Sequence, residues 1–155
     1  MLAAKFQSLT TYDLNGKSVT LPDDFEHDFN LLFVAYDRWH QQEVDSWIPF
    51  AAELEAEFKK FHFYELPIVG QMNVIGRARL DFFMRQGIPN PETRGRTLTY
   101  YVDRAQFRQM LGIETAEHIA TVLVDRSGTV LWKAYGPFVE AQAIELKNKL
   151  KQFAV

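Results

Sequence analysis

Cysteine is absent from all 155 residues of the chain. A thiolate is the nucleophile of thiol peroxidases and disulfide oxidoreductases, and cysteines hold iron–sulfur clusters and many zinc ions. The absence of cysteine therefore excludes thiol-dependent redox chemistry and every cysteine-held metal site.

Several other signatures are also missing from the sequence. It has no GxSxG element, no glycine-rich phosphate loop and no HExxH spacing, which are the patterns of serine hydrolases, nucleotide-binding loops and zinc peptidases. We therefore assign no catalytic residue and expect no cofactor and no metal. A net charge of −3 disfavours nucleic acid as a partner, because that binding rests on neutralising phosphates.

Targeting and membrane segments are not apparent either. No signal-peptide pattern follows Met1, and no apolar run reaches the 18 or so residues that a membrane-spanning helix needs. We therefore expect a cytoplasmic protein that is not embedded in a membrane.

The composition itself is that of a folded protein, with 47% hydrophobic and 14% aromatic residues. A chain of this length predicts one globular domain, residues 1–155, with a substantial core.

Hydrophobic periodicity predicts alternating strands and helices. The expected strands are 6–12, 18–21, 29–36, 61–69, 97–102, 119–125 and 130–135, and the expected helices are 44–58, 73–86, 103–110 and 139–153. Early alternation implies a parallel central pair, and the late hairpin adds antiparallel strands. The predicted fold class is therefore α/β with a mixed central sheet.

The helix over 44–58 is expected to begin at a cap formed by Asp45, or earlier, near Gln41, with Pro49 then inside it. The helix over 73–86 is expected to turn Val74, Ala78, Phe82 and Phe83 toward the core, because these residues recur at helical spacing.

Three stretches resemble one known fold. They are Asp13-Leu14-Asn15-Gly16-Lys17-Ser18-Val19-Thr20-Leu21, Leu31-Leu32-Phe33-Val34-Ala35-Tyr36 and Val122-Leu123-Val124-Asp125-Arg126-Ser127-Gly128-Thr129-Val130. Together they resemble the thioredoxin-like superfamily in its peroxiredoxin-type form. The resemblance implies a three-layer sandwich with an N-terminal hairpin and helices on both faces of the sheet.

A more remote similarity is to the thioredoxin-like ATP synthase assembly factors of mitochondria. It rests on Trp39-His40-Gln41-Gln42-Glu43-Val44-Asp45-Ser46-Trp47 and on the same late hairpin.

The chain departs from the redox members of this superfamily at two places. They carry a reactive cysteine where the strand meets the helix, which corresponds to positions 38–43 here, and a cis-proline before the late strand, which corresponds to about Ile119. Neither residue is present. The resemblance therefore implies a fold and the location of a site, but not thiol chemistry.

The strand-to-helix junction is the candidate binding site. Ligands of open α/β sheets collect at the carboxyl ends of strands, near the free amides of helix N-termini. The predicted binding residues are Asp37, Arg38, Trp39, His40, Gln41, Glu43 and Trp47. We expect Trp39, His40 and Trp47 to lie together, with Trp47 half-buried; the alternative is a polar loop in which Trp39 merely packs as cover.

Charge is unevenly distributed along the chain. Residues 1–60 carry 5 basic and 11 acidic residues, whereas residues 77–108 carry seven arginines, no lysine and three acids. Arginine forms forked bonds with carboxylates and phosphates. This segment is either an anionic-partner surface or a set of ion pairs with nearby acids, and the second interpretation is favoured. Glu53, Glu55 and Glu57 are interpreted as a solvated helix face, and His62 as a core or edge histidine.

These observations lead to two hypotheses of function. The first is a redox-inactive thioredoxin-like domain that binds another protein, as an assembly or chaperone-like factor does. The second is a thiol-independent enzyme or a small-molecule binder, for a thiol or an anion, that uses the same site. Assembly into a homodimer is a further option.

Overall fold

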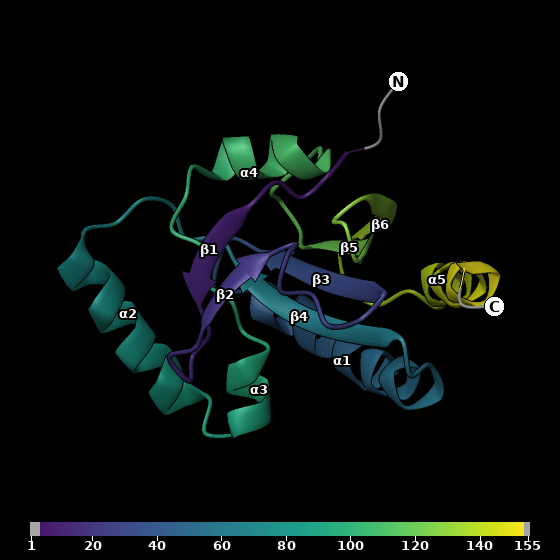
Figure 1. The fold of residues 1–155 in the computed structure, drawn as a ribbon, viewed down its shortest axis with the longest axis horizontal. Helices are drawn as coiled ribbons and strands as arrows, with labels where there is room; N and C mark the ends of the chain where they lie inside the picture. The colour runs from purple at the N-terminus through teal and green to yellow at the C-terminus, as the bar shows by residue number, and fades with distance from the viewer. Residues whose placement is uncertain (1–3, 154–155) are drawn as a thin grey trace.

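The computed structural model describes residues 4–153. Its central sheet has four strands in the order β4-β3-β5-β6. They are β3 (Phe29–Ala35), β4 (Phe61–Pro67), β5 (Ala120–Asp125) and β6 (Val130–Tyr135). β3 pairs with β4 in parallel and with β5 antiparallel, and β5 pairs antiparallel with β6. The predicted α/β class and mixed sheet are therefore confirmed, and Figure 1 shows the arrangement.

A separate hairpin precedes the sheet, as expected. It consists of β1 (Leu9–Tyr12) and β2 (Ser18–Leu21). Gly16 in the connecting turn has φ of +85°, a backbone region that side chains with a Cβ disfavour.

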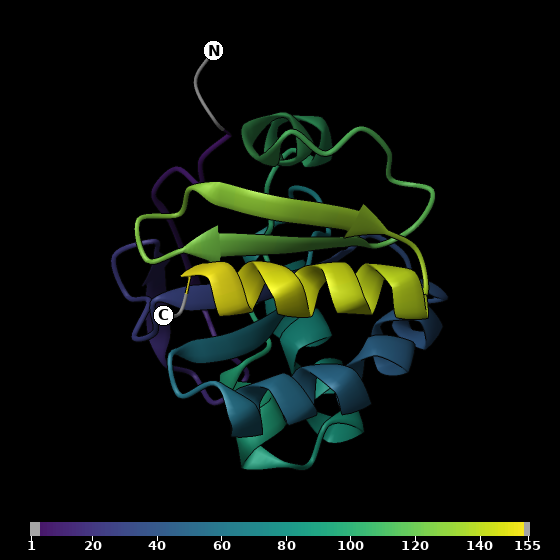
Figure 2. The ribbon, with the colours of Figure 1, turned by 90° about the vertical axis from the view of Figure 1, so that its right-hand side faces the viewer.

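The sheet separates two layers of core because successive side chains of a strand point to opposite faces. On one face, Leu31 and Phe33 pack with α1 (His40–Glu57) and α5 (Glu140–Phe153). Figure 2 shows these two helices in front of the sheet. On the other face, Leu32 and Val34 pack against the N-terminal segment, the hairpin, residues 98–100 and α4 (Arg104–Leu111). Helices thus cover both faces of the sheet, as predicted.

Helix α1 has the earlier of the two starts that the sequence left open. Trp39 is its N-cap and Pro49 lies inside it, so the cap at Asp45 was wrong. In place of a side-chain cap on α1, the His40 imidazole closes the turn that precedes the helix. Helix α4 follows the prediction: Asp103 accepts from the Gln106 amide at 2.9 Å, and Gly112 ends the helix with φ of +68°.

Residues 88–102 differ from the prediction. The expected strand over 97–102 is reduced to isolated bridges, Glu65 with Thr97 and Ile68 with Tyr100, along the outer edge of β4. A short helix not foreseen in the sequence, α3 (Pro91–Gly95), precedes it, with Asn90 as its N-cap. This segment bridges to the outer edge of β4, and the preceding helix contacts it through Met84 and Asp81, which bond with Thr99 and Tyr101.

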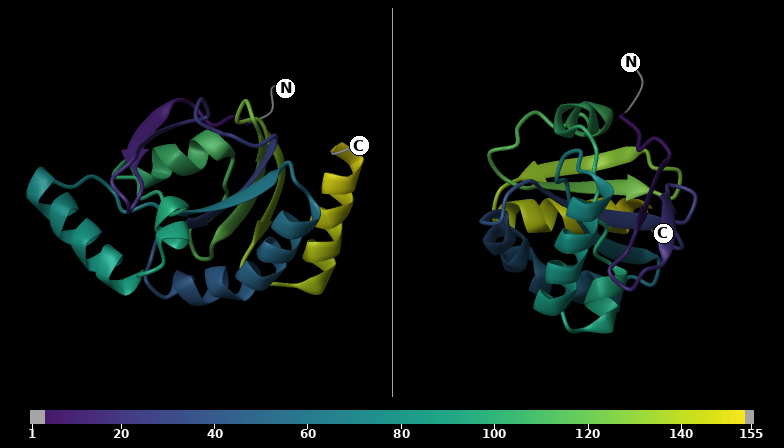
Figure 3. Two further views of the ribbon diagram at one scale, coloured as in Figure 1. Left: turned by 60° about the horizontal axis from the view of Figure 1, so that its bottom comes forward. Right: turned by 90° about the vertical axis from the view of Figure 1, so that its left-hand side faces the viewer.

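That preceding helix is α2 (Val74–Gly87), which has no buried residue. Figure 3 shows it at the side of the molecule opposite α5. Val74, Ala78, Phe82 and Phe83 are all exposed, so the prediction that they face the core was wrong.

No helix within residues 4–153 is both long and apolar enough to cross a membrane.

Candidate functional site

The strand-to-helix junction is built around the His40 side chain, which is fully buried. Its Nδ1 accepts from the backbone amides of Tyr36 and Asp37 at 3.0 and 3.1 Å. Because Nδ1 accepts, the ring proton is on Nε2, which faces the Glu117 carbonyl at 3.1 Å. His40 therefore joins the end of β3 to the loop before β5.

Glu43, one turn further along α1, makes a second connection to the same loop. Its Oε1 accepts from the Ile119 amide at 3.0 Å, and its Oε2 lies 2.8 Å from Nδ1 of His118. The single cis peptide bond among the described residues is Leu21–Pro22. The loop before β5 is thus held by side chains of α1, without a cis-proline.

Trp47 differs from its expected environment. Its side chain has 0% exposure, and its Nε1 donates to the Gly136 carbonyl at 3.1 Å. The ring packs against Phe33 of the core and against the partly exposed Phe138. The expectation of a half-buried Trp47 was wrong, because the residue lies on the helix stripe that faces the sheet.

Trp39 is the accessible aromatic residue of the junction, with half of its surface exposed. Its ring centroid lies 4.3 Å from that of His40 and 5.9 Å from that of His118. Trp39 and His40 therefore lie together as predicted, whereas Trp47 is part of the hydrophobic core.

The remaining predicted residues, Asp37, Arg38 and Gln41, are exposed and line a cavity of about 470 Å³. We call it the strand-end cavity, because it opens at the carboxyl ends of β3 and β4. Its other lining residues are mainly apolar, and α2 contributes Leu80 and Met84. Arg104, at the start of α4, adds a guanidinium that donates to the Val69 carbonyl at 3.3 Å.

A second cavity of about 720 Å³ adjoins the first and shares Gln41 and Met84 with it. Its wall holds the Glu65 carboxylate, whose Oε1 accepts from Nε2 of Gln41 at 3.2 Å. The same Nε2 donates to Asp45 at 2.8 Å. Burial raises the pKa of Glu65, and the neighbouring charge of Asp45 adds to the effect.

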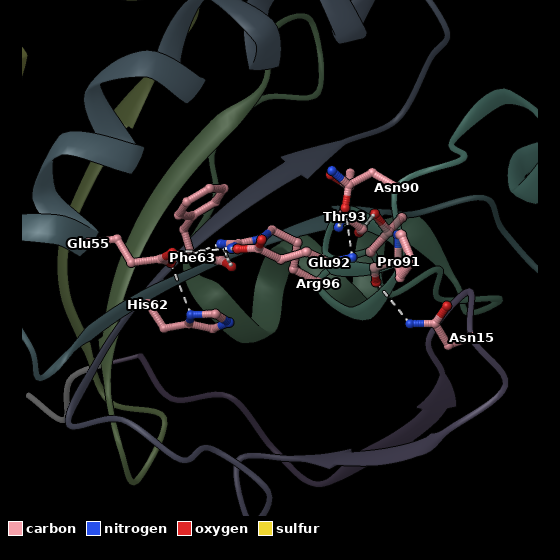
Figure 4. A network of polar contacts seen from close by, with 10 residues as sticks. Asn15, Glu55, His62, Phe63, Asn90, Pro91, Glu92, Thr93 and Arg96 are labelled. Atoms are coloured by element: carbon pink, nitrogen blue, oxygen red, sulfur yellow. Dashed lines mark hydrogen bonds and ion pairs between the residues drawn. The ribbon is translucent and has the colours of Figure 1, made fainter.

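Arg96, Glu55 and Glu92 also line this second cavity. They belong to the polar network that Figure 4 shows. Arg96 is 6% exposed, and its guanidinium donates to both carboxylate oxygens of Glu55 at 2.9 and 3.2 Å and to one of Glu92 at 2.7 Å. It also lies 3.9 Å from the centroid of the Phe63 ring.

Glu55 in turn lies 3.0 Å from Nδ1 of His62, so it is not part of a fully solvated face as expected. Burial opposes the charged form of Glu55, but its bonds to Arg96 hold its pKa below the ordinary value. Arg96 thus connects α1, β4 and α3, and it belongs to the scaffold.

The other arginines contradict the favoured interpretation of residues 77–108. Within residues 4–153, Arg96 is the one member of the group that forms an ion pair. Arg94 donates instead to the carbonyls of Arg85 and Ile88. The ion-pair interpretation is therefore wrong for most of the group, which leaves the anionic-partner interpretation open.

The most exposed apolar surface lies on α2 and was missed by sequence reasoning. Phe82 is 58% exposed and Phe83 is 64% exposed. Together they border a hollow that we call the α2 patch, made of Val74, Ile75, Ala78, Arg79, Phe82 and Phe83. The signal available in the sequence was the three arginines within a supposed core helix.

The side chains present offer little to a metal ion. Within the part of the chain that the structure describes, no group of three or more histidine, aspartate or glutamate side chains is placed to hold one.

Comparisons with known proteins identify the fold and no closer relationship. No protein-family model matches the chain, and no curated protein matches it. Solved structures do match over nearly the whole chain. A thiol:disulfide interchange protein from a Bacteroides species matches with a TM-score of 0.59 and 18% identity, over 99% of this chain and 90% of that one.

Two further solved structures show the same similarity. The thioredoxin domain of a thiol-disulfide oxidoreductase from Bacteroides vulgatus matches with a TM-score of 0.61 and 17% identity, over 100% and 99% of the two chains. An exposed lipoprotein thioredoxin of Streptococcus pneumoniae matches with a TM-score of 0.57 and 15% identity, over 94% and 99%. The chain therefore has a thioredoxin-like fold, as the resemblance implied.

Proposed function

We propose that this chain is a redox-inactive thioredoxin-like domain whose function is to bind another protein, in the manner of an assembly or chaperone-like factor. The first support is chemical: the chain has no cysteine, and disulfide exchange proceeds by attack of a thiolate. The buried His40 and Glu43 hold the junction together by hydrogen bonds, which is a structural use of that position.

The observation that carries the proposal is the exposure of α2. A helix of 14 residues buries none of them and presents Phe82 and Phe83 to solvent. Large contiguous apolar patches are uncommon on monomeric proteins and mark interaction sites. Fully burying a phenylalanine side chain contributes roughly 1.5–3 kcal/mol, so a partner that covers this patch gains a substantial driving force.

Three exposed residues of the predicted junction line the strand-end cavity, to which α2 also contributes. Asp37, Arg38 and Gln41 line the strand-end cavity together with Leu80 and Met84 of α2. Trp39, half-exposed, flanks them in the chain. We therefore include Asp37, Arg38, Trp39 and Gln41 in the proposed binding surface and assign His40, Glu43 and Trp47 to its support.

Site-specific photo-crosslinking tests this proposal. A photoreactive phenylalanine analogue placed at Phe82, at Trp39 or at Ile144 is irradiated in an extract of the native source, and products are identified by mass spectrometry. Ile144 is a matched control because it is an exposed apolar residue of α5, on the opposite side of the molecule from α2. We expect one protein to be captured from positions 82 and 39 and not from 144. Equal capture from all three positions would overturn the proposal.

A second candidate function rests on the strand-end cavity itself. Its apolar floor and the guanidinium groups of Arg38 and Arg104 suit a small anion or thiol with an apolar body. Thermal-shift measurements with small carboxylates and thiols test this. A ligand that stabilises the protein but not its Arg38→Gln variant would favour small-molecule binding.

The cytoplasmic location and the homodimer stay predictions.

A further inference from the structure

The arginines of α2 indicate what kind of partner its apolar patch could bind. Arg77, Arg79 and Arg85 are exposed and form no ion pair with any residue between 4 and 153. The one acid of the helix, Asp81, accepts a hydrogen bond from the Tyr101 hydroxyl at 2.7 Å. Arg77 also turns inward, with its guanidinium 5.2 Å from the centroid of the Tyr101 ring.

Arg79 and Arg85 flank Phe82 on the helix surface. Arg79 lines the α2 patch, and residues three or four apart on a helix are neighbours. Arg79 is therefore adjacent to Phe82 and Phe83, and Arg85 is adjacent to Phe82 on its other side. The outward face of α2 therefore carries Arg79 among its apolar side chains and Arg85 beside Phe82.

We infer that the segment that covers the α2 patch is an acidic amphipathic helix of a partner protein; this rests on the protein-binding function proposed above. Carboxylates of such a helix would accept forked bonds from Arg79 and Arg85, while its apolar stripe would cover Phe82 and Phe83. A helix suits the site because α2 offers a ridged side-chain surface into which another helix packs. The site offers no free strand edge, since residues 97–100 bridge to the outer edge of β4.

Charge disfavours a second copy of the chain as the occupant. Symmetric pairing of two α2 patches would bring Arg79 and Arg85 of both copies together, and Asp81, the only acid of the helix, faces Tyr101. Like charges at close range oppose association. An acidic partner helix meets no such opposition.

Three fluorescent model peptides test the inference with the full chain. All are amphipathic helices with one leucine stripe, and their polar faces carry glutamate, glutamine or lysine. Binding is followed by fluorescence anisotropy at low and at physiological salt. The variants are Phe82→Ser, Arg79→Gln/Arg85→Gln, and Lys59→Gln as a control, because Lys59 is an exposed cation outside α2. Far-ultraviolet circular dichroism checks that each variant is folded.

We expect the glutamate peptide to bind most tightly and to weaken as salt rises. The double arginine variant should lose about tenfold in affinity for it while binding the glutamine peptide as before. Phe82→Ser should weaken both peptides, and Lys59→Gln should weaken neither.

Other outcomes would overturn the inference, and each would identify which part of it is wrong. Equal binding of the glutamate and glutamine peptides would refute the acidic partner and leave protein binding at α2 intact. Preferential binding of the protein to vesicles of anionic lipid over all the peptides would replace the partner by a membrane surface. A dimer in sedimentation that Phe82→Ser abolishes would make a second copy the occupant. If no peptide binds and position 82 also captures no protein, the inference and the proposed function both fail.

Discussion

Helices α1 and α2 have similar sequence patterns but lie in opposite environments. Each follows a strand of the parallel pair and carries apolar residues at helical spacing. Helix α1 buries six residues, whereas α2 buries none. The difference arises from what each helix can cover: α1 lies on one face of the sheet, while the edge beside α2 is occupied by residues 97–100. An apolar stripe at helical spacing therefore does not by itself show whether the chain buries that helix.

The largest expected effect is on α1. Trp47→Ala should lower the free energy of unfolding by roughly 3–5 kcal/mol, because it removes a fully buried indole and the bond to the Gly136 carbonyl. Chemical denaturation measures it. If that variant does not fold, Leu54→Ala in the same core should lose roughly 2–5 kcal/mol. A loss below about 1 kcal/mol in both would contradict the burial of α1.

The next largest effect is expected for Arg96, which connects α1 with β4 and α3. Arg96→Met should cost roughly 2–3 kcal/mol, since it leaves the Glu55 carboxylate without its main partner; the exposure of Glu92 keeps the loss below that of a fully buried pair. Arg79→Met is the matched control and should change stability by less than about 0.5 kcal/mol. Equal effects of the two substitutions would show that the Arg96 network contributes nothing.

A smaller effect is expected from acidification. Burial lowers the pKa of His62 below its ordinary value of 6.5, so the unfolded chain binds a proton there that the folded chain does not. Stability should therefore fall as pH drops below 6.5. The lowered pKa of Glu55 acts in the same direction at lower pH: its contribution is complete above the ordinary carboxyl pKa and is lost as pH falls through the lowered one.

The substitution His62→Gln tests whether His62 causes this pH dependence of stability. Denaturation midpoints measured at several pH values between about 5 and 7 should decline less steeply in the variant than in the parent protein. An unchanged slope would assign the pH dependence to other groups.

The smallest effect is predicted for α2. Phe82→Ser should change the free energy of unfolding by less than about 0.5 kcal/mol, because more than half of the phenylalanine is already exposed. The same variant should weaken partner binding. A loss of stability comparable to that of Trp47→Ala would mean that α2 packs against the body of the protein, and the contrast between the helices would disappear.

Local patterns in the sequence predicted most of the elements. The run Phe29–Ala35 is a central strand, Asp103 caps α4, and Gly16 lies in the hairpin turn as expected. These features depend on short-range chemistry: side-chain alternation, a carboxylate three residues before an amide, and a glycine at positive φ. The start of α1 was left open, because it depends on bonds from His40 to backbone groups, including the distant Glu117.

The exposure of the residues at the strand-to-helix junction was predicted only in part. Trp39 and Arg38 are accessible at the junction, whereas Trp47 is buried and the α2 patch was assigned to the core. The arginines of residues 77–108 show what the sequence alone could not predict. Their excess is visible in the sequence. That only Arg96 among them pairs with carboxylates within residues 4–153 depends on which surfaces meet in the fold.

By itself, the sequence determined that thiol chemistry is impossible and that strands and helices alternate, because residue identity and short-range periodicity are local properties. Tertiary structure alone decided which apolar stripes are covered. Residues 97–100 bridge to the edge of β4 and leave α2 outside, and no local pattern contains that information. The physical reason is that burial depends on contacts between segments far apart in the chain. Two helices with similar periodicity therefore became a core element and an exposed surface.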